Sequence, residues 1–338
     1  MKALQIVNPG EITIVDIPVP EISEGEILLK INFIGLCGSD LSTYLGKNPM
    51  IQYPRIPGHE ISATISEIGN NVPDTFSAGQ KVTVVPYTSC GSCSSCKNGK
   101  TNACRNNQTL GVQRDGALTE YIAVPWQKII NTGRLSEKEL ALTEPLTVGF
   151  HAVDRGNVTD SDIVMVLGCG MIGTGAIIRA ALRGATVIAV DIDDDKLKLA
   201  KKLGAQVTIN SIKENIHDVL EKITHGHGPS VVIEAAGNPK TYQLAINEIA
   251  FTGRIVFIGY VKDEVPFQTK LFVQKEINIM GSRNATLKDF EAVIQYLETG
   301  KCPVENLISR VVSMAETSEA ISYWADHPGE ILKILVKL

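Results

Sequence analysis

The sequence predicts an α/β protein with two domains, one made of many short strands and one built on a doubly wound parallel sheet. A length of 338 residues suits two domains of ordinary size. As far as residue 153, short apolar runs are separated by Gly, Pro, Asn and Asp, a texture typical of short strands joined by loops. Near Asp162 the texture changes to strand-like runs that alternate with helical ones, which implies βαβ units.

The clearest strands of the first part are expected at residues 26–33, 61–68 and 80–86. Their short length favours a barrel or sandwich over a layer of helices. In the second part, strands are expected at 163–167, 186–190, 206–209, 230–234, 254–258 and 276–280, with helices at 193–203 and 239–249. A helix at 287–299 and a closing strand at 331–338 complete the chain.

Composition excludes several classes of function. The chain has 44% hydrophobic and 20% charged residues, as ordinary globular proteins do, and this excludes disorder for most of it. A net charge of −5 argues against a nucleic-acid or membrane partner. The first residues lack a secretory signal pattern, and glycines interrupt the longest apolar stretch, at 163–178. We therefore expect a cytoplasmic protein.

A glycine motif directly follows the predicted strand 163–167 and opens a helix. Its expected cofactor-binding residues are Gly168, Gly170, Met171, Ile172 and Gly173. Glycines at this spacing allow a tight turn, close approach to a pyrophosphate, and packing of helix on strand. Asp191 ends the next strand, where a carboxylate binds the ribose hydroxyls of NAD and repels a 2′-phosphate. The motif predicts an NAD site, against the alternative of a glycine-rich loop without a cofactor.

Four cysteines lie close together in the first part: Cys90, Cys93, Cys96 and Cys104. Four thiolates can close a tetrahedral zinc site and leave no position for a substrate, so the predicted zinc is structural. Two alternatives are unpaired reactive thiols and a nucleic-acid-binding zinc knuckle. The knuckle is disfavoured because the loop lacks the combination of basic and aromatic surroundings that such modules use.

A second set of possible metal ligands is dispersed: Cys37, His59, Glu60 and Glu144. Spacing alone leaves open whether they share a metal, since a single cysteine is often a core residue and a Gly-His-Glu turn can be a polar loop. Sulfur, nitrogen and oxygen donors together suit a catalytic zinc with one open position.

Several motifs occur in a fixed order along nearly the whole chain: GLCGSD at 35–40, PGHE at 57–60, the four cysteines, EPL at 144–146, the glycine motif, and GSRNA at 281–285. This set resembles the zinc-containing medium-chain alcohol dehydrogenases, and most closely their polyol branch of sorbitol, sugar-acid and threonine dehydrogenases. The resemblance implies a GroES-like β-barrel catalytic domain at 1–150 and 283–338, and a Rossmann domain at 151–282.

The resemblance also implies roles for the dispersed residues. Cys37, His59 and Glu60 would bind the catalytic zinc, with Glu144 beside it as a ligand or exchange partner. Asp40 would orient the His59 ring.

Three further residues would complete the implied site. Ser39 would hydrogen-bond the substrate hydroxyl. Arg283 would contact the cofactor or the substrate pocket, and Tyr44 is a second pocket candidate, although a core or surface role fits either one.

The implied reaction is reversible oxidation of a secondary alcohol in a polyol, sugar acid or related hydroxy compound, with NAD as acceptor. Two zinc ions per chain and a homodimer or homotetramer are expected. The alternatives are an activity of the L-threonine 3-dehydrogenase type and a non-catalytic zinc- and nucleotide-binding protein on the same fold.

Two positions depart from the family pattern. Ser42 stands where many relatives have a histidine that passes the proton to solvent, so the relay would use Ser39, the cofactor ribose, water or Ser42 itself. Ala63 replaces the last glycine of GHExxG, a small change.

His151, His225 and His227 are expected to be packing or loop residues. The acidic run 193–195 is expected to start a helix and not to bind a metal.

Overall fold

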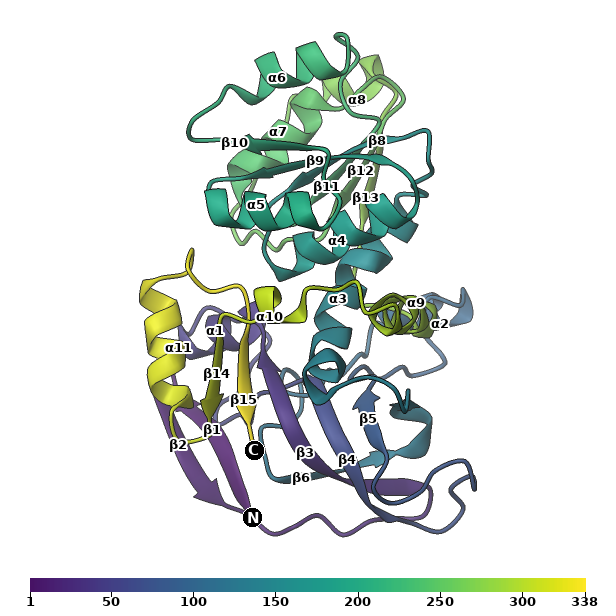
Figure 1. The fold of residues 1–338 in the computed structure, drawn as a ribbon, viewed down its shortest axis with the longest axis vertical. Coiled ribbons are helices and arrows are strands. Elements are labelled where there is room, and N and C mark those ends of the chain that lie inside the picture. Colours follow the sequence, from purple (N-terminus) through teal and green to yellow (C-terminus); the bar gives the residue numbers. More distant parts are fainter. The chain divides into compact units, whose positions relative to one another are not determined.

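The structure is a computed structural model that describes residues 1–338. The chain divides into two compact units: Met1–Glu144 with Phe290–Leu338, and Pro145–Asp289 (Figure 1). The sequence predicted the domain boundaries after residues 150 and 282. No helix combines the length and apolarity needed to cross a bilayer.

The first unit is built on strands that are mostly antiparallel. A hairpin of β1 (Lys2–Asn8) and β2 (Glu11–Asp16) accompanies a seven-stranded sheet. The path through that sheet is β14-β15-β3-β4-β5-β7, with β6 also paired to β3, and only β14 and β15 are parallel. The sheet strands are β3 (Glu26–Leu36), β4 (Glu60–Ile68), β5 (Lys81–Val84), β6 (Tyr121–Pro125), β7 (Ile129–Asn131), β14 (Arg310–Ser313) and β15 (Ile334–Lys337).

Short helices connect these strands. They are α1 (Gly38–Tyr44), α2 (Ser94–Lys97), α10 (Val304–Leu307) and α11 (Thr317–Asp326), with 3-10 turns at Thr101–Ala103 and Trp126–Lys128. Two longer helices, α3 (Glu137–Arg155) and α9 (Leu287–Glu298), contain the points where the chain passes from one unit to the other. The core of the first unit includes apolar residues of β3 and β4 that are buried completely or almost completely, such as Leu29, Ile31 and Ile61.

The expectation of short strands as far as residue 153 is wrong for α3. This helix has 19 residues and contains Pro145. Proline removes a backbone donor and normally ends a helix, so its position in the middle of the segment concealed the helical pattern. This helix matters for the candidate site because it carries Glu144.

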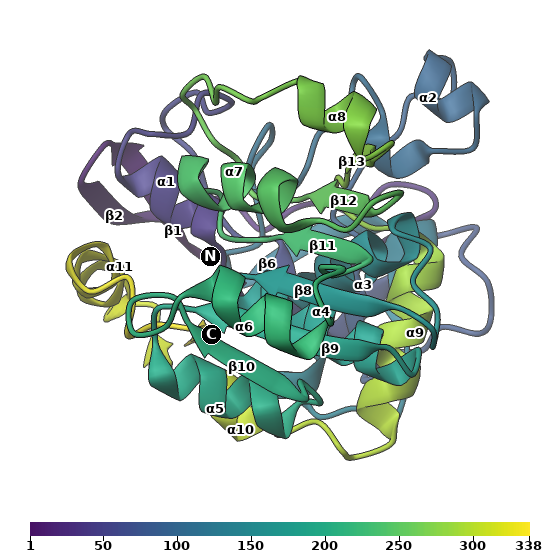
Figure 2. The ribbon, with the colours of Figure 1, turned by 90° about the horizontal axis from the view of Figure 1, so that it is seen from above.

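The second unit is a six-stranded parallel sheet of order β10-β9-β8-β11-β12-β13. Its strands are β8 (Ile163–Leu167), β9 (Thr186–Asp191), β10 (Val207–Asn210), β11 (Val231–Glu234), β12 (Arg254–Phe257) and β13 (Asn278–Gly281). Its helices are α4 (Met171–Leu182), α5 (Asp194–Lys202), α6 (Ile216–Ile223), α7 (Pro239–Glu248) and α8 (Lys270–Gln274), and Figure 2 shows strands and helices alternating. Right-handed connections place helices on both faces of such a sheet.

The sheet of the second unit confirms the doubly wound arrangement. Strand β8 lies in the middle, and the chain winds from it toward β10 on one side and toward β13 on the other. Its central residues Val164, Met165 and Val166 are fully buried, as expected for a strand covered on both faces. The carboxyl ends of β8 and β11 meet where the winding direction reverses, the usual position of a ligand crevice in these folds.

Candidate active site and metal centres

The adjacent ends of β3 and β4 in the first unit bring three of the four dispersed residues together, namely Cys37, His59 and Glu60. Cys37 directly follows the end of β3, and Glu60 begins the antiparallel strand β4. Gly35 of β3 pairs with Glu60, while Leu36 pairs with Ile334 at the start of β15. The strand register therefore places residues 37, 60 and 333 close together although the sequence separates them widely.

Cys37, His59 and Glu60 form a compact triad. One ligand atom from each side chain lies within 4.8 Å of the ligand atoms of the other two. His59 and Glu60 are buried, and Cys37 is partly exposed. One sulfur, one nitrogen and one oxygen donor at this separation fit a zinc site with a position left for a substrate oxygen.

Glu144 lies in α3 and is held by a residue that the sequence did not suggest. The phenol hydroxyl of Tyr87 donates a hydrogen bond to Glu144 Oε1, and both side chains are buried. Burial raises the pKa of Glu144 and, together with the Glu144 charge, raises the pKa of Tyr87 well above its usual value. Tyr87 therefore remains a neutral donor. In the sequence, the only signal that pointed to Tyr87 was its position three residues before Cys90.

Asp40 caps the helix that follows Cys37. Its Oδ2 accepts the Cys37 backbone N–H at 2.8 Å. The other oxygen, Oδ1, and the Nδ1 atom of His59 are both buried without a hydrogen-bond partner. Burial raises the pKa of Asp40, and the nearby His59 opposes that shift. No hydrogen bond joins these two atoms, so an orienting role for Asp40 stays a prediction.

His59 is surrounded by negative groups. Burial favours the neutral ring, but Cys37, Asp40 and Glu144 together raise its pKa well above the usual value. The Oγ atom of Ser39 is also buried without a hydrogen-bond partner, which leaves it able to bind a substrate hydroxyl. An excess of negative charge and unpartnered polar atoms is the setting in which a dication binds well.

Lys333 is the second residue that sequence reasoning missed. Its side chain is 3% exposed, and its Nζ lies 2.6 Å from both carboxylate oxygens of Glu60 and 2.9 Å from the Leu36 carbonyl oxygen. Burial would lower the pKa of Lys333, but Glu60 and Cys37 raise it above its usual value. The signal in the sequence was a single charge inside the apolar run 331–336.

The four cysteines form a separate cluster. The Sγ atoms of Cys90, Cys93, Cys96 and Cys104 all lie within 4.8 Å of one another. Hydrogen bonds from Ser92 and the backbone lower the pKa of Cys90 to about 5, whereas burial raises the pKa of Cys96 to about 11.

The backbone of this loop is shaped for the cluster. Gly91 and Gly99 have φ of +69° and +70°, which glycine adopts without strain. Backbone N–H groups of Cys90 and Cys93 point at the sulfurs of Cys104 and Cys90, at 3.3 and 3.4 Å. Four sulfurs held in this way fit a closed structural zinc site.

The glycine turn of the second unit has the geometry of a pyrophosphate cradle. Gly168 has φ of +93°, and a Cβ at Gly173 would come within 1.8 Å of the Gly168 carbonyl oxygen. A Cβ at Gly170 would meet nothing within 4 Å, so the backbone at the start of α4 is open. Met171 and Ile172 form the first turn of that helix, whose free N–H groups favour phosphate.

Glu234 supports this turn from the neighbouring strand, although no motif in the sequence marked it. The side chain ends β11, is fully buried, and accepts hydrogen bonds from the N–H groups of Ala236 and Gly237 at 3.0 and 2.8 Å. Ala236 in turn lies against Gly168, where an added Cβ would be 3.0 Å away. Burial raises the pKa of Glu234.

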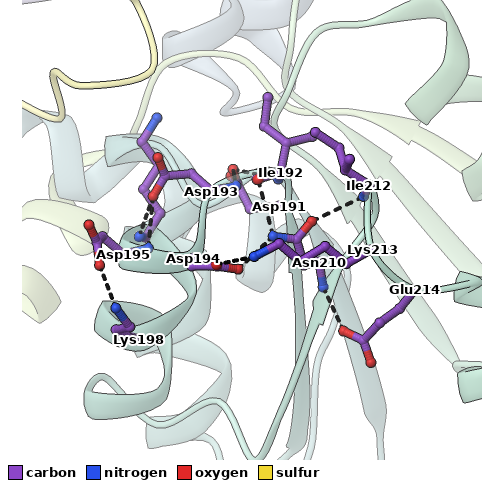
Figure 3. Close-up of polar contacts among 11 residues, drawn as sticks. Asp191, Ile192, Asp193, Asp194, Asp195, Lys198, Asn210, Ile212, Lys213 and Glu214 are labelled. Atoms are coloured by element: carbon purple, nitrogen blue, oxygen red, sulfur yellow. Dashed lines mark hydrogen bonds and ion pairs between the residues drawn. The ribbon is translucent and has the colours of Figure 1, made fainter.

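Asp191 lies at the end of β9, as expected, and its carboxylate is fixed by the backbone (Figure 3). Oδ2 accepts the Cys169 N–H at 2.6 Å, and Oδ1 accepts the N–H groups of Ile192 and Asp193. These bonds tie the glycine turn to the next strand. Oδ2 has only one of these donors and can accept a further hydrogen bond from a ribose hydroxyl.

The acidic run after Asp191 starts a helix, as the sequence predicted. Asp193 Oδ1 accepts the N–H groups of Asp195 and Lys196 and so caps α5. Asp194 pairs with Lys213 and accepts a hydrogen bond from Asn210 Nδ2 (Figure 3). The cap and the ion pair account for these carboxylates without a metal.

The remaining candidates lie as follows. Arg283 is partly buried in the loop after β13, at the same edge of the sheet as the glycine turn. Tyr44 ends α1 and packs against the core of the first unit. His151 is buried, with Nδ1 3.0 Å from Asp289 Oδ2, and His225 and His227 are exposed in the loop after α6. The two loop histidines are thus where the sequence placed them.

Comparison with known families gives two matches. A model described as an alcohol dehydrogenase GroES-like domain matches residues 23–134, and one described as a zinc-binding dehydrogenase matches residues 172–299. The first match lies within the first unit, and the second covers most of the second unit and extends to residue 299 of the first.

Similar proteins match along most of their length. The chain is 34% identical to the L-galactonate-5-dehydrogenase of Escherichia coli, over 90% of this chain and 89% of that protein. It is 32% identical to the sorbitol dehydrogenase of Bacillus subtilis, over 99% and 97%. Among solved structures, an alcohol dehydrogenase from Escherichia coli in complex with NADH superposes with a TM-score of 0.92 at 30% identity, covering 100% of this chain and 99% of the other.

Proposed function

The chain belongs to the zinc-containing alcohol dehydrogenases, and we propose that it oxidises a secondary alcohol in a polyol, a sugar acid or a related hydroxy compound to a ketone. NAD accepts the hydride, and the reaction is reversible. The observation that carries this proposal is the buried triad of Cys37, His59 and Glu60, with sulfur, nitrogen and oxygen donors within 4.8 Å of one another. The named relatives that act on sorbitol and L-galactonate support the substrate class.

The triad would hold the catalytic zinc, with Glu144 as a ligand or exchange partner. When bound, zinc supplies Lewis acidity that lowers the pKa of the substrate alcohol. Ser39, whose Oγ is otherwise unpartnered, orients the hydroxyl that reacts and accepts its proton on the way to solvent. Ser42 lies one helical turn further along α1 and replaces the histidine relay of relatives, so water and hydroxyl groups complete the proton path.

The glycine turn and Asp191 would bind NAD in the second unit, with Arg283 as a further contact. A carboxylate fixed by three backbone N–H groups cannot move away from a 2′-phosphate, so NAD is preferred strongly over NADP. We expect Asp191→Ala to weaken the binding of NAD and to reduce the ratio of kcat/KM for NAD to that for NADP by about tenfold or more. Equal kcat/KM for both cofactors in the unaltered protein would refute the assignment.

Two alternatives remain distinct in what they predict. An activity of the L-threonine 3-dehydrogenase type uses the same zinc and NAD sites and differs only in the substrate pocket. A non-catalytic zinc- and nucleotide-binding protein would not need a triad that leaves one metal position open, which argues against it.

The deciding experiment is a screen for NADH formation with polyols, aldonates, sugar phosphates and L-threonine, with ethanol as the control. We expect the best vicinal diol or 2-substituted secondary alcohol to exceed ethanol by about a hundredfold in kcat/KM, or ~3 kcal/mol of transition-state binding. The reason is that a second substrate oxygen fixes the orientation of the reacting one. Ethanol as good as every polyol and acid would refute the substrate class, and L-threonine alone would select the alternative.

A homodimer or homotetramer is part of the same proposal. Strand β13 is the last strand of its sheet and pairs only with β12, and most of its residues are exposed. An unpaired edge of this kind can pair with the same strand of a second copy. Light scattering should give a multiple of the chain mass, and Ile279→Pro, which blocks strand pairing, should reduce it. A monomer in the unaltered protein would contradict this part.

A further inference from the structure

Arg114 and Lys128 of the first unit are partly buried cations without a counter-charge. None of the ion pairs in the chain includes either side chain. The carboxylate that follows Arg114 in the sequence, Asp115, pairs with Arg55 at 2.9 Å instead. The chain has 37 acidic residues against 32 Lys and Arg, so counter-charges are not scarce. Removing a cation from water without an anion is costly, and these two are therefore candidates for binding an anionic ligand.

Both side chains retain unused hydrogen-bond donors. The Nε atom of Arg114 is buried and has no hydrogen-bond partner. Lys128 Nζ donates to the carbonyl oxygen of Tyr87 at 2.7 Å, which uses one of its three protons. Burial lowers the pKa of Arg114, and burial together with the nearby Arg114 charge lowers the pKa of Lys128. A guanidinium fork and an ammonium this close together match the several acceptor oxygens of a carboxylate or a phosphate.

The backbone brings the two cations to either side of one segment, which follows β5. On one side, the carbonyl oxygen of Lys128 accepts the N–H of Val85 at 2.8 Å. On the other side, the Leu110 N–H donates to the carbonyl oxygen of Pro86 at 3.1 Å, and Leu110 forms an isolated β-bridge with Arg114. Backbone pairing thus places the two cations around this segment.

The same segment continues into the candidate active site. Its next residue, Tyr87, accepts a hydrogen bond from Lys128 through its carbonyl oxygen and donates one through its hydroxyl to Glu144 Oε1. The Glu144 carboxylate is close enough to His59 and Glu60 for their charges to act on its pKa. One residue therefore connects the lysine to the metal triad.

The loop that carries Arg114 also packs against the backbone of the triad. A Cβ added at Gly111 would lie 2.5 Å from the backbone nitrogen of Gly58, so only glycine allows this approach. Gly58 directly precedes His59. Each cation is therefore linked to the proposed metal site by contacts within the first unit.

We propose that Arg114 and Lys128 bind the anionic group of the substrate, a carboxylate or a phosphate, while a secondary hydroxyl of the same molecule reacts at the triad. This inference rests on the proposed function, because it requires the substrate to be oxidised at Cys37, His59 and Glu60. Within the proposed substrate class, it selects sugar acids and polyol phosphates over neutral polyols. A neutral polyol cannot form the charge-assisted hydrogen bonds that these cations offer.

The first test compares kcat/KM for an anionic substrate with kcat/KM for the neutral polyol of the same configuration. The anionic substrates are the aldonate and the polyol phosphate that the unaltered protein oxidises best. We expect at least one of them to exceed the neutral polyol by about tenfold or more, since hydrogen bonds between charged groups are the stronger ones. An advantage of the aldonate identifies a carboxylate site, and an advantage of the polyol phosphate identifies a phosphate site. A neutral polyol that equals or exceeds both overturns the inference.

Variants test whether the two cations cause this preference. Arg114→Gln should reduce the ratio of anionic to neutral kcat/KM by about tenfold or more, whereas Arg114→Lys keeps the charge and should lose only about threefold. Lys128→Gln should reduce the ratio by about fivefold. Lys81→Gln is the matched control, because Lys81 lies in β5 of the same unit and is paired with Glu137 at 3.1 Å. Its ratio should match that of the unaltered protein.

Two results with the variants contradict the inference. A ratio that stays within about threefold in both Arg114→Gln and Lys128→Gln shows that neither cation contacts the anionic group. An equal loss with anionic and neutral substrates shows that the cations act through the position of Tyr87 instead. Thermal unfolding of the same samples verifies folding, and Lys128→Gln with Arg114→Lys replaces Arg114→Gln if that variant does not fold.

A binding measurement separates this inference from the proposed function. Inorganic phosphate is titrated into the protein by calorimetry, with NADH present to occupy the glycine turn. We expect the double variant Arg114→Gln with Lys128→Gln to bind phosphate about tenfold more weakly than the unaltered protein. Equal phosphate affinity overturns the inference. If phosphate binding depends on both cations but no secondary alcohol is oxidised, the anion site stands and the proposed function fails.

Discussion

The four-cysteine cluster and the Cys37–His59–Glu60 triad are both metal centres in composition, but the chain assembles them in different ways. The cysteines lie between residues 90 and 104 on one loop, and three of the four remain at least partly exposed. The triad and its partner Lys333 come from the adjacent ends of β3, β4 and β15, and most of that centre is buried. One centre depends on a loop closing around a metal, whereas the other is held by the sheet.

Their stabilising interactions differ accordingly. Backbone N–H groups approach the sulfurs of Cys90 and Cys104 in the cysteine cluster. In the triad, Lys333 balances the charge of Glu60, and Tyr87 holds the nearby Glu144. The metal should therefore contribute to the stability of the first centre and to the chemistry of the second. Variants of the two centres test this contrast.

Cys37→Ser should abolish turnover, with a loss of about a thousandfold or more in kcat, because the thiolate donor is lost from the triad. The melting temperature should change little, since β3 and α1 keep their packing. Activity and thermal unfolding are measured on the same sample. Cys302→Ser, which lies outside both clusters, is the control and should behave like the unaltered protein. Unfolding of Cys37→Ser at room temperature would contradict the contrast.

Cys93→Ser should have the opposite effect. We expect one zinc equivalent fewer by elemental analysis and a melting temperature lower by roughly 5–15 °C, since a few kcal/mol of metal-linked stability is lost from the first unit. Turnover should match that of the unaltered protein when it is normalised to the folded protein whose triad holds zinc. The contrast fails if Cys93→Ser keeps both zinc equivalents after careful reconstitution, or if it loses activity without losing stability.

Ser39→Ala should reduce kcat/KM by about a hundredfold, because the variant lacks the hydroxyl that would touch the reacting oxygen. Ser42→Ala is the matched control on the same helix and should cost less than about fivefold. Both are measured with the best substrate from the screen. A larger loss for Ser42→Ala would place the proton path elsewhere.

Tyr87→Phe should have the smallest of the four effects. It removes one hydrogen bond to Glu144, and a buried carboxylate that loses a neutral donor costs ~1–3 kcal/mol. We expect about 1.4 kcal/mol of this cost to fall on the transition state, which corresponds to about a tenfold loss in kcat. Tyr53→Phe loses a hydroxyl bonded to the Thr43 carbonyl oxygen in the same unit and is the control, with unchanged kcat. An equal loss in both variants would assign Tyr87 to packing alone.

Much of this protein was determined by the sequence locally. Strands β8 (Ile163–Leu167) and β12 (Arg254–Phe257) occur where the apolar runs 163–167 and 254–258 predicted them, because a strand buried on both faces needs consecutive apolar residues. The glycine turn and Asp191 are also local features, since a φ of +93° at Gly168 requires glycine in any fold. The cysteine spacing alone placed four sulfurs within reach of one metal.

Other features were decided only by the tertiary structure. Lys333 reaches Glu60 because β15 pairs with β3, a register that no neighbouring residue encodes. Tyr87 reaches Glu144 because α3 continues through Pro145, where local propensity predicts a break. In both cases the deciding factor is the burial of a charge: a carboxylate inside a protein must find a donor, and which donor it finds depends on the strands and helices that pack around it.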